Sequence, residues 1–569
     1  MLITFYVPFI VLSSVSIFFL LLSLLVKIWG YIKRKKAEDL NSHGKSRFFL
    51  PFIYTATIFF ALSILSLSII DIIPWYLSSF TIGVLLFFLM LSIGNFKNTL
   101  FTHKEEETDT DSLIKIPRLS EYLKLAAATL VIFGTVFLIG WIFSDMCICV
   151  VPTQVNFAIN RVSQNDPCKY TICYVYLTLP ENPSNSMIVM FHSGVNLKKP
   201  SVKLSLKTMN TSIDSSLSID VKDAQTYQAN KTRLASLSIE RYVYVAYLSN
   251  LNPETDYYFI AYDEEAKLYT KEYKFRTLPL SESLASNKTI RFSVGGDAGL
   301  TSRSKRVLRN AVLTEPYFMM IGGDITYANG MKYCYERVDK WFFMWQKISI
   351  TPNNYMVPLL TSIGNHEAGI SFHSDIAYTA FYKYYFVHSV PTENLIDLPT
   401  YHVHNISGSV ILVLDSCVLV PSDHIQPDFI NRHLSKNYLW KMALYHAPLY
   451  PSVRSFTNSI SKSLRQDWEP LFDRHHLHVG FENHDHAYKR THFMKAGEQV
   501  TPQNGTLYLG DGSIGVDPRT PITSRDYLVV SKKTNFHFDV SMSNESMIIN
   551  AIDINNVTID SILLNQDSS

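Results

Sequence analysis

Four long runs without a charged residue occupy much of the first 144 residues and constrain the fold more than any other feature of the sequence. They cover residues 1–26, 48–70, 72–96 and 125–144. Each run reaches the roughly 20 residues that an α-helix needs to cross a hydrocarbon core of about 30 Å. We therefore predict four transmembrane helices in residues 1–145. A cleaved signal peptide is the alternative for the first run, but no basic segment precedes that run.

The charges between these runs predict the orientation of the chain. The loop after the first run contains Lys33, Arg34, Lys35 and Lys36, whereas only Asp71 separates the second run from the third. Basic loops remain cytoplasmic, and the loop over residues 97–124 is also rich in lysine. The chain after residue 144 is therefore expected in a secretory lumen or outside the cell. We expect an integral protein of the plasma membrane or of an endo-lysosomal or vacuolar membrane, with the lipid bilayer as a partner.

The overall charge argues against a nucleic-acid partner. The chain has 51 Lys and Arg residues against 49 Asp and Glu residues, a net charge of only +2. Such a chain has no summed positive field with which to neutralise a phosphate backbone. The oligomeric state is not predicted by these features.

Cysteines and glycosylation sequences agree with a lumenal or extracellular position. Cys168 and Cys173 could close a short disulfide loop, while Cys334 and Cys417 could either pair or be buried thiols. Seven N-x-S/T sequences follow the last predicted membrane helix, although a chain rich in Asn, Ser and Thr would contain about as many by chance. They begin at Asn210, Asn230, Asn287, Asn405, Asn504, Asn544 and Asn556.

Residues 146–280 have the pattern of an all-β sandwich. Short segments rich in Val, Ile, Tyr and Thr, such as residues 174–179, 187–191 and 242–247, alternate with clusters of Asn, Pro, Ser and Gly. The end of this region resembles the closing strands of a fibronectin type III-like module.

Residues 288–555 change to a layered α/β pattern. Apolar runs of strand length end in short polar loops, and the runs alternate with helical stretches at residues 302–314 and 335–348. Polar residues at strand ends are typical of binding sites in open sheets. The loops are Gly295-Gly-Asp297-Ala-Gly299, Gly322-Gly-Asp324-Ile-Thr-Tyr327, Gly364-Asn365-His366-Glu367, Tyr445-His446, Asn483-His484-Asp-His486 and Gly510-Asp511-Gly512.

The side chains of these loops are suited to binding two metal ions. Two carboxylates, a carboxamide, a phenol and three imidazoles combine hard oxygen ligands with borderline nitrogen ligands. Carboxylates and phenolate favour a hard trivalent ion, and imidazoles with an amide favour a divalent ion. The loops therefore predict a binuclear centre.

The order of these motifs resembles the purple acid phosphatase branch of the metallophosphoesterases, with motifs GDxG, GDxxY, GNH(D/E), xxH and GHxH. The resemblance implies a three-part architecture: a membrane region, a fibronectin III-like sandwich, and an α/β metallophosphoesterase sandwich with αββα layers. It also implies that Fe(III) and a second divalent metal (Zn, Fe or Mn) are the cofactors. The implied iron ligands are Asp297, Tyr327 and His486, with Asp324 as the bridge and Asn365, His446 and His484 around the second ion.

Two cations close together would lower the pKa of a bound water and offset charge on a phosphate ester. His366 is the residue we expect to contact phosphate or to protonate the leaving group, the alternative being a structural brace. Glu367 is expected to brace the loop. His475, His476 and His478 lie nearby in sequence, and a helix end and a strand face are the preferred interpretation for them.

The sequence also departs from the family pattern. Asn483 replaces the glycine before His-x-His, which is expected to strain or re-aim that turn, and Ser455 and Phe456 stand where larger members have histidines. The resemblance implies an acid phosphatase that hydrolyses phosphomonoesters, either small molecules or phosphoproteins. The alternative is a membrane receptor or scaffold that retains the fold with little turnover.

Overall fold

The computed structural model describes residues 166–209, 224–233, 240–284, 288–331, 334–392 and 394–566. All of them belong to one compact unit, Arg161–Ser569. The four predicted membrane runs lie outside the described residues. Within the described ranges no helix combines the length and apolar character needed to cross a bilayer.

The first part of this unit is the expected β-sandwich. Its two layers enclose a core that includes Val175, Val189, Tyr244, Phe259 and Phe275. One layer contains β1, β2, β6 and β5, and the other has the order β4-β3-β7-β8 with β9 also paired to β7. Their bounds are β1 Ile172–Thr178, β2 Met187–Ser193, β3 Pro200–Ser205, β4 Gln225–Gln228, β5 Asn230–Arg233, β6 Tyr242–Leu248, β7 Asp256–Asp263, β8 Leu268–Tyr269 and β9 Tyr273–Arg276.

One sheet runs through both the sandwich and the α/β region. Its order is β23-β22-β21-β10-β11-β12-β1-β2-β6-β5, and the junction is the parallel pair β1 and β12, where Thr178 lies opposite Leu359. The sheet also extends past residue 555, because β23 pairs with β22. The new strands are β10 Ile290–Gly295, β11 Met319–Gly322, β12 Leu359–Ser362, β21 Phe536–Met542, β22 Ser546–Asp553 and β23 Thr558–Asn565.

A second sheet of eight strands faces this one. Its order is β13-β14-β15-β16-β19-β17-β18, and β20 pairs with β17. Strands β14, β15, β16 and β19 are parallel, so their carboxyl ends meet at one edge. The bounds are β13 His402–Ile406, β14 Ser409–Val413, β15 Lys441–Leu444, β16 Val479–Phe481, β17 Tyr488–Lys495, β18 Glu498–Val500, β19 Thr506–Gly510 and β20 Leu528–Lys532.

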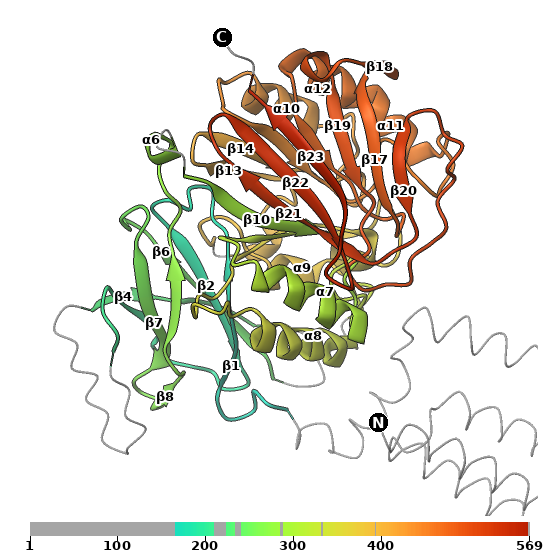
Figure 1. Cartoon of the computed structure of the whole chain (residues 1–569). Coiled ribbons are helices and arrows are strands. Elements are labelled where there is room, and N and C mark those ends of the chain that lie inside the picture. Colours follow the sequence, from blue (N-terminus) through green and yellow to red (C-terminus); the bar gives the residue numbers. More distant parts are fainter. Residues whose placement is uncertain are drawn as a thin grey trace, which may run out of the picture. The chain divides into compact units, whose positions relative to one another are not determined.

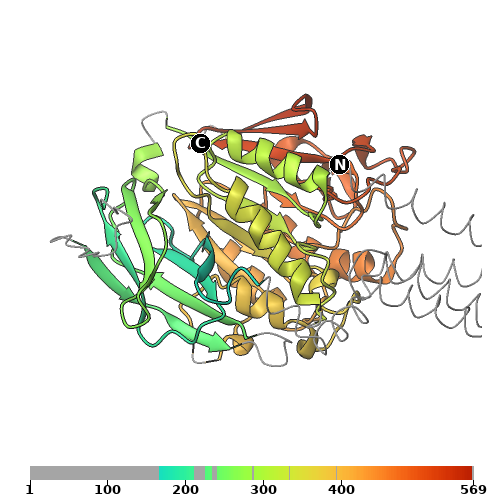
Figure 2. The ribbon, with the colours of Figure 1, turned by 90° about the horizontal axis from the view of Figure 1, so that it is seen from below.

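Helices pack against both sheets, as Figures 1 and 2 show. Helices α7 and α8 lie side by side and contact strands of the first sheet, while α10, α11 and α12 pack on the second. The predicted helices at 302–314 and 335–348 correspond to α7 and α8. The helical segments are α6 Ser281–Leu284, α7 Ser302–Leu313, α8 Tyr335–Ile348, η4 Asn365–Glu367, η5 Ile376–Tyr378, α9 Ala380–Tyr385, η6 Leu395–Asp397, α10 Gln426–Leu434, α11 Ser459–Asp467, α12 Glu469–His475 and η7 Pro502–Asn504.

The alternation of side chains along the strands explains the layers. In β14, Ile411 and Val413 join the core between the two sheets, whereas Val410 and Leu412 join the core beneath α10–α12. Successive residues of a strand point to opposite faces. Both faces of this strand are therefore apolar, as expected for a buried parallel strand.

The cysteine expectations are resolved in part. Cys168 and Cys173 form the short disulfide loop. Cys334 is disulfide-bonded, but Cys417 is a buried free thiol. The pairing of Cys334 with Cys417, one of the two alternatives, is therefore wrong.

Candidate metal centre

The seven side chains expected to bind metal all follow the carboxyl ends of strands. They come from both sheets, so the two sheets together form one site. Asp297 follows β10, Asp324 and Tyr327 follow β11, Asn365 follows β12, His446 follows β15, and His484 and His486 follow β16.

Three of these side chains form one half of the site. The Tyr327 hydroxyl lies 3.2 Å from Asp297 Oδ1 and 3.2 Å from His486 Nε2. The same Nε2 and Oδ1 atoms are 3.0 Å apart. A phenol, a carboxylate and an imidazole therefore converge on one small volume.

The other half of the site is built around His446. Its Nε2 atom lies 3.0 Å from Asn365 Oδ1, 3.0 Å from His484 Nδ1 and 3.2 Å from Asp324 Oδ2. Asp324 also groups with Asp297 and His486, with ligand atoms within 4.8 Å of one another. Asp324 is thus the carboxylate common to both halves.

The donor set of the second half fits a cation better than it fits hydrogen bonds. His446 Nδ1 lies 2.9 Å from the carbonyl oxygen of Gly322, which can only accept, so Nδ1 carries a proton. Nε2 then faces two oxygens that can only accept, Asn365 Oδ1 and Asp324 Oδ2, together with His484 Nδ1, whose role depends on its tautomer. Asp324 Oδ2 is buried and, within the described part of the chain, accepts no well-aligned hydrogen bond. A metal ion would satisfy all of these atoms together.

The electrostatics of this half favour positive charge beside Asp324. Burial lowers the pKa of His446, but the Asp324 carboxylate outweighs burial and raises it to about 9. Burial raises the pKa of Asp324, but His446, His366 and His484 outweigh it and hold that pKa far below its usual range. Burial and then Asp324 raise the pKa of Glu367 to about 8. The Asp324 carboxylate therefore favours a positively charged neighbour.

Glu367 holds two of the site loops together, as the sequence led us to expect. Its Oε2 atom accepts hydrogen bonds from the amides of Asp324 (2.7 Å) and Gly364 (3.0 Å), and its Oε1 atom accepts one from Ile325 (2.8 Å). The loop after β11 is therefore tied to the loop after β12. Glu367 is buried and is not itself among the converging ligand atoms.

His366 lies at the edge of the same site. Its Nδ1 atom is 2.6 Å from Asn329 Oδ1, its Nε2 atom is 3.9 Å from Asp324 Oδ2, and its ring centre is 4.2 Å from that of Tyr327. The side chain is 21% exposed, so a substrate could reach it. Burial lowers the pKa of His366 despite the nearby Asp324. The Asn329 contact orients the ring, and Nε2 remains available for proton transfer.

The backbone at the site takes a conformation that the sequence did not reveal. Asp297, Asp324, Tyr327, His484 and His486 have φ values of 54°, 52°, 57°, 76° and 58°. Non-glycine residues with positive φ are uncommon and cluster at functional sites. The neighbouring glycines Gly299, Gly323 and Gly512 also have positive φ values, of 62°, 82° and 62°, so glycines and ligand residues together form these turns.

Asn483 is accommodated by packing. Its side chain fills space that Cβ atoms on Gly296 and Gly322 would otherwise occupy, at 2.2 Å and 1.8 Å from its nearest atoms. Its amide Nδ2 donates to the carbonyl of Tyr445 (2.8 Å), and its backbone amide donates to the carbonyl of His446 (2.9 Å). The departure from glycine therefore connects the β15 loop to the β16 loop. The strained backbone is at His484 and His486.

Ser455 and Phe456 are engaged in local packing. Ser455 Oγ lies 3.0 Å from Thr457 Oγ1. The Phe456 ring lies 3.6 Å from the Arg465 guanidinium and also packs on Tyr527. Neither side chain takes part in the site.

Three residues that lie near the site were not identified from the sequence. Arg454 Nη1 donates to the carbonyl of His484 (2.6 Å) and to Asp485 Oδ1 (2.7 Å). The Phe372 ring meets that of His484 edge to face at 5.1 Å. Arg519 donates its backbone amide to the carbonyl of His486 (2.7 Å). No motif marks these residues, because each lies in an irregular loop that only the fold brings close.

The other histidines near these loops have structural positions. His475 ends α12, and His476 follows it with φ of 54° as the helix cap. His478 Nδ1 accepts the amide of Lys441 beside β16. The helix-end interpretation is confirmed for His475 and His476, and His478 immediately precedes β16.

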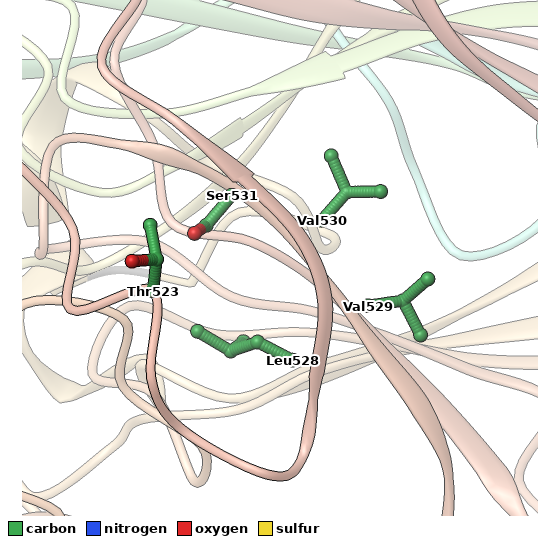
Figure 3. A pocket seen from close by; sticks show the side chains of 5 residues that line it. All are labelled: Thr523, Leu528, Val529, Val530 and Ser531. Carbon is green, nitrogen blue, oxygen red and sulfur yellow. The ribbon is translucent and has the colours of Figure 1, made fainter.

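A separate hollow of about 280 Å³ lies beside the edge strand β20. Its lining consists of Thr523, Leu528, Val529, Val530 and Ser531 (Figure 3). It contains none of the seven expected ligands and no ionisable side chain. This hollow is therefore not the candidate centre.

Comparison with known proteins agrees with the motifs. Residues 172–277 match the model of the purple acid phosphatase N-terminal domain. Purple acid phosphatase 23 of Arabidopsis thaliana is 27% identical over 269 residues, which are 43% of this chain and 56% of the relative. Purple acid phosphatase 15 of the same plant is 24% identical over 291 residues, 47% of this chain and 52% of the relative. These matches support the purple acid phosphatase family.

The resemblance extends to the fold. A purple acid phosphatase from yellow lupin (Lupinus luteus) seeds superposes with a TM-score of 0.59 at 18% identity, over 70% of this chain and 75% of that one. The described part is thus a sheet-rich metallophosphoesterase-like fold with an N-terminal β domain. The chain spans about half the length of the plant relatives it matches.

Proposed function

We propose that this chain is a purple acid phosphatase-type phosphomonoesterase with a binuclear metal centre. The observation that carries the proposal is the position of Asp324, whose carboxylate belongs to both groups of converging ligand atoms. A carboxylate has two oxygens, so one placed between two groups of ligands could bind two neighbouring metal ions of the kind found in two-metal hydrolases. The similarity to purple acid phosphatases supports the same reaction class, metal-dependent hydrolysis of phosphate esters.

The residues would divide between the two ions as the resemblance to purple acid phosphatases implies. Asp297, Tyr327 and His486 would hold Fe(III), because carboxylate and phenolate are hard ligands. Asn365, His446 and His484 would hold a divalent ion such as Zn, Fe or Mn, with Asp324 between the two. When bound, the ions would supply Lewis acidity that activates water and offsets the charge of the phosphate.

The protein residues would orient the ester and move a proton. Asn329 holds the Nδ1 side of His366, which leaves Nε2 facing the site. Protonated at Nε2, His366 would donate that proton to the oxygen of the departing alcohol. Glu367 and Asn483 would keep the ligand loops at fixed separation through the hydrogen bonds described above. Small-molecule phosphate esters and phosphoproteins are both candidate substrates.

We further propose that four N-terminal helices anchor the catalytic unit on the lumenal or extracellular side of a membrane. The proposal rests on the uncharged runs and the basic loops between them. Exposed sequons at Asn230, Asn504 and Asn556 are compatible with glycosylation on that side. The receptor or scaffold alternative would share this anchor and would lack turnover.

Two variants separate a metal ligand from a proton donor. Asp324→Ala should abolish hydrolysis of p-nitrophenyl phosphate and lose both metals, because the carboxylate is shared. His366→Ala should retain both metals while kcat falls by roughly 10² to 10⁴, the range for a general acid or base. His475→Ala, outside the site, serves as the control and should change neither quantity.

Two outcomes of this experiment would count against the proposal. Equal metal loss in Asp324→Ala and His366→Ala would refute the separation of roles. A metal-loaded wild-type chain without measurable turnover would instead favour the receptor or scaffold.

A further inference from the structure

A loop that follows the metal-site strands carries an arginine to the edge of the site. After β19, the amides of Gly515 and Val516 donate to the carbonyl of Asp297, at 3.2 and 3.4 Å. A few residues later, the amide of Arg519 donates to the carbonyl of His486 at 2.7 Å. Backbone hydrogen bonds therefore connect both ends of this loop to residues expected to bind metal. These bonds hold the backbone of Arg519 next to the site.

The positive charge of Arg519 is not matched by a partner. The residue is exposed, and within the described residues its guanidinium forms no hydrogen bond or ion pair. It is close enough to interact electrostatically with Arg454, Asp297, Asp485 and Tyr327. Partial burial and then the like charge of Arg454 lower the pKa of Arg519.

The nearby carboxylates already accept hydrogen bonds from other groups. Asp485 is buried, and its two oxygens accept from the guanidinium of Arg454 (2.7 Å) and from the amides of Val453 (2.6 Å) and Arg454 (2.9 Å). Asp297 accepts from the amide of His484 and faces Tyr327 and His486. Arg454 thus occupies the Asp485 carboxylate, and among the described residues the Arg519 guanidinium has no carboxylate of its own at the edge of the site.

Two like charges held near each other are unfavourable unless an anion joins them. Guanidinium groups recognise phosphate oxygens through charge-assisted hydrogen bonds. The scissile phosphate would lie among the buried ligands and His366, whereas Arg519 is exposed outside that group. The unmatched charge is therefore placed to meet a second anionic group on the substrate.

We propose that Arg519 determines specificity by binding an anionic group on the leaving-group side of the substrate. Substrates whose leaving group carries a further phosphate, such as nucleoside diphosphates with their terminal phosphoanhydride bond, are then preferred over esters with uncharged leaving groups. For a nucleoside diphosphate, water adds to the terminal phosphorus and the bond to the bridging oxygen breaks. The nucleoside monophosphate leaves on that oxygen, and inorganic phosphate is the second product. This inference rests on the proposed phosphatase activity.

The test compares two substrates in the full-length, metal-loaded protein. Arg519→Gln should lower kcat/KM for ADP by roughly 10- to 100-fold, the range for losing one charge-assisted hydrogen bond. The same variant should change kcat/KM for p-nitrophenyl phosphate less than about threefold, because that leaving group carries no phosphate. Arg519→Lys should recover part of the ADP activity. Arg474→Gln, which removes an exposed arginine on α12, should change neither value.

The outcomes distinguish this inference from the proposed function. Equal losses for both substrates in Arg519→Gln, or no loss for ADP, would overturn the role of Arg519 while phosphatase activity stands. A wild-type protein that hydrolyses neither substrate would overturn the proposed function and this inference with it. A selective loss for ADP cannot be produced by a merely structural role, because misfolding would lower both activities.

Discussion

Replacing Glu367 by Ala tests whether this residue holds the metal-site loops together. The carboxylate accepts three buried backbone amides at 2.7, 2.8 and 3.0 Å. Leaving a buried donor without an acceptor costs about 1–3 kcal/mol, so the three amides together cost about 3–9 kcal/mol. Part of this is offset, because the substitution also removes the repulsion between Glu367 and Asp324 that raises the pKa of Glu367. We expect a net loss of about 2–5 kcal/mol in the free energy of unfolding.

The assay is urea denaturation of the full-length protein, with and without added metal. Glu367→Ala should lower the urea midpoint and weaken metal binding, because Asp324 and Gly364 lose their common anchor. Glu367→Gln should lie between Ala and wild type, since its carbonyl oxygen can still accept. Glu498→Ala, an exposed glutamate on β18, is the control. An unchanged urea midpoint and metal affinity in Glu367→Ala would refute the argument that this carboxylate holds the loops.

Three further predictions address the iron, the pH dependence and the membrane. Tyr327→Phe removes only the hydroxyl, so the protein should fold but lose the visible absorption band expected from a phenolate on Fe(III). Its hydrolytic activity should fall less than that of Asp324→Ala. A colourless, active wild-type protein with full metal occupancy would contradict the iron assignment. Burial lowers the pKa of His404 to about 4. Between about pH 6.5 and pH 4 this histidine is therefore protonated in the unfolded chain but neutral in the folded chain. The free energy of unfolding consequently falls by about 1.4 kcal/mol for each pH unit towards pH 4. His404→Asn should therefore lose about 2 kcal/mol less than wild type between pH 7 and pH 5 in urea denaturation. In cells, protease should reach the unit containing Asp297 only from the lumenal or extracellular side, with glycans on some sequons; an unglycosylated, cytoplasmically cleaved protein would contradict the topology.

Much of the candidate site follows from the sequence because its information is local. Each loop combines a strand end with a short polar motif, and although each motif is weak by itself, their order along the chain marks Asp297, Asp324 and His446 as ligands. Parallel strands then place their carboxyl ends at one edge, and the loops meet. The helices α7 and α8 likewise match the helical stretches expected at residues 302–314 and 335–348.

The parts that could not be predicted depend on contacts between distant residues. The pairing of Thr178 with Leu359 joins the sandwich to the α/β region in one sheet, and no local pattern marks it. Arg519 reaches the site through a hydrogen bond to His486, which the sequence cannot show. His484 has a φ of 76°, a left-handed conformation that is uncommon for any residue other than glycine and that no local sequence signal marks.

The central claim is that Asp324 joins two metal ions in a hydrolytic centre. The most direct test is to titrate the metal-free, full-length chain with Fe(III) and Zn(II) while recording both bound metal and hydrolysis of p-nitrophenyl phosphate. The account predicts that activity appears in full only when two ions are bound per chain, and that Asp324→Ala binds neither tightly. Full activity with a single bound ion, or without metal, would contradict it.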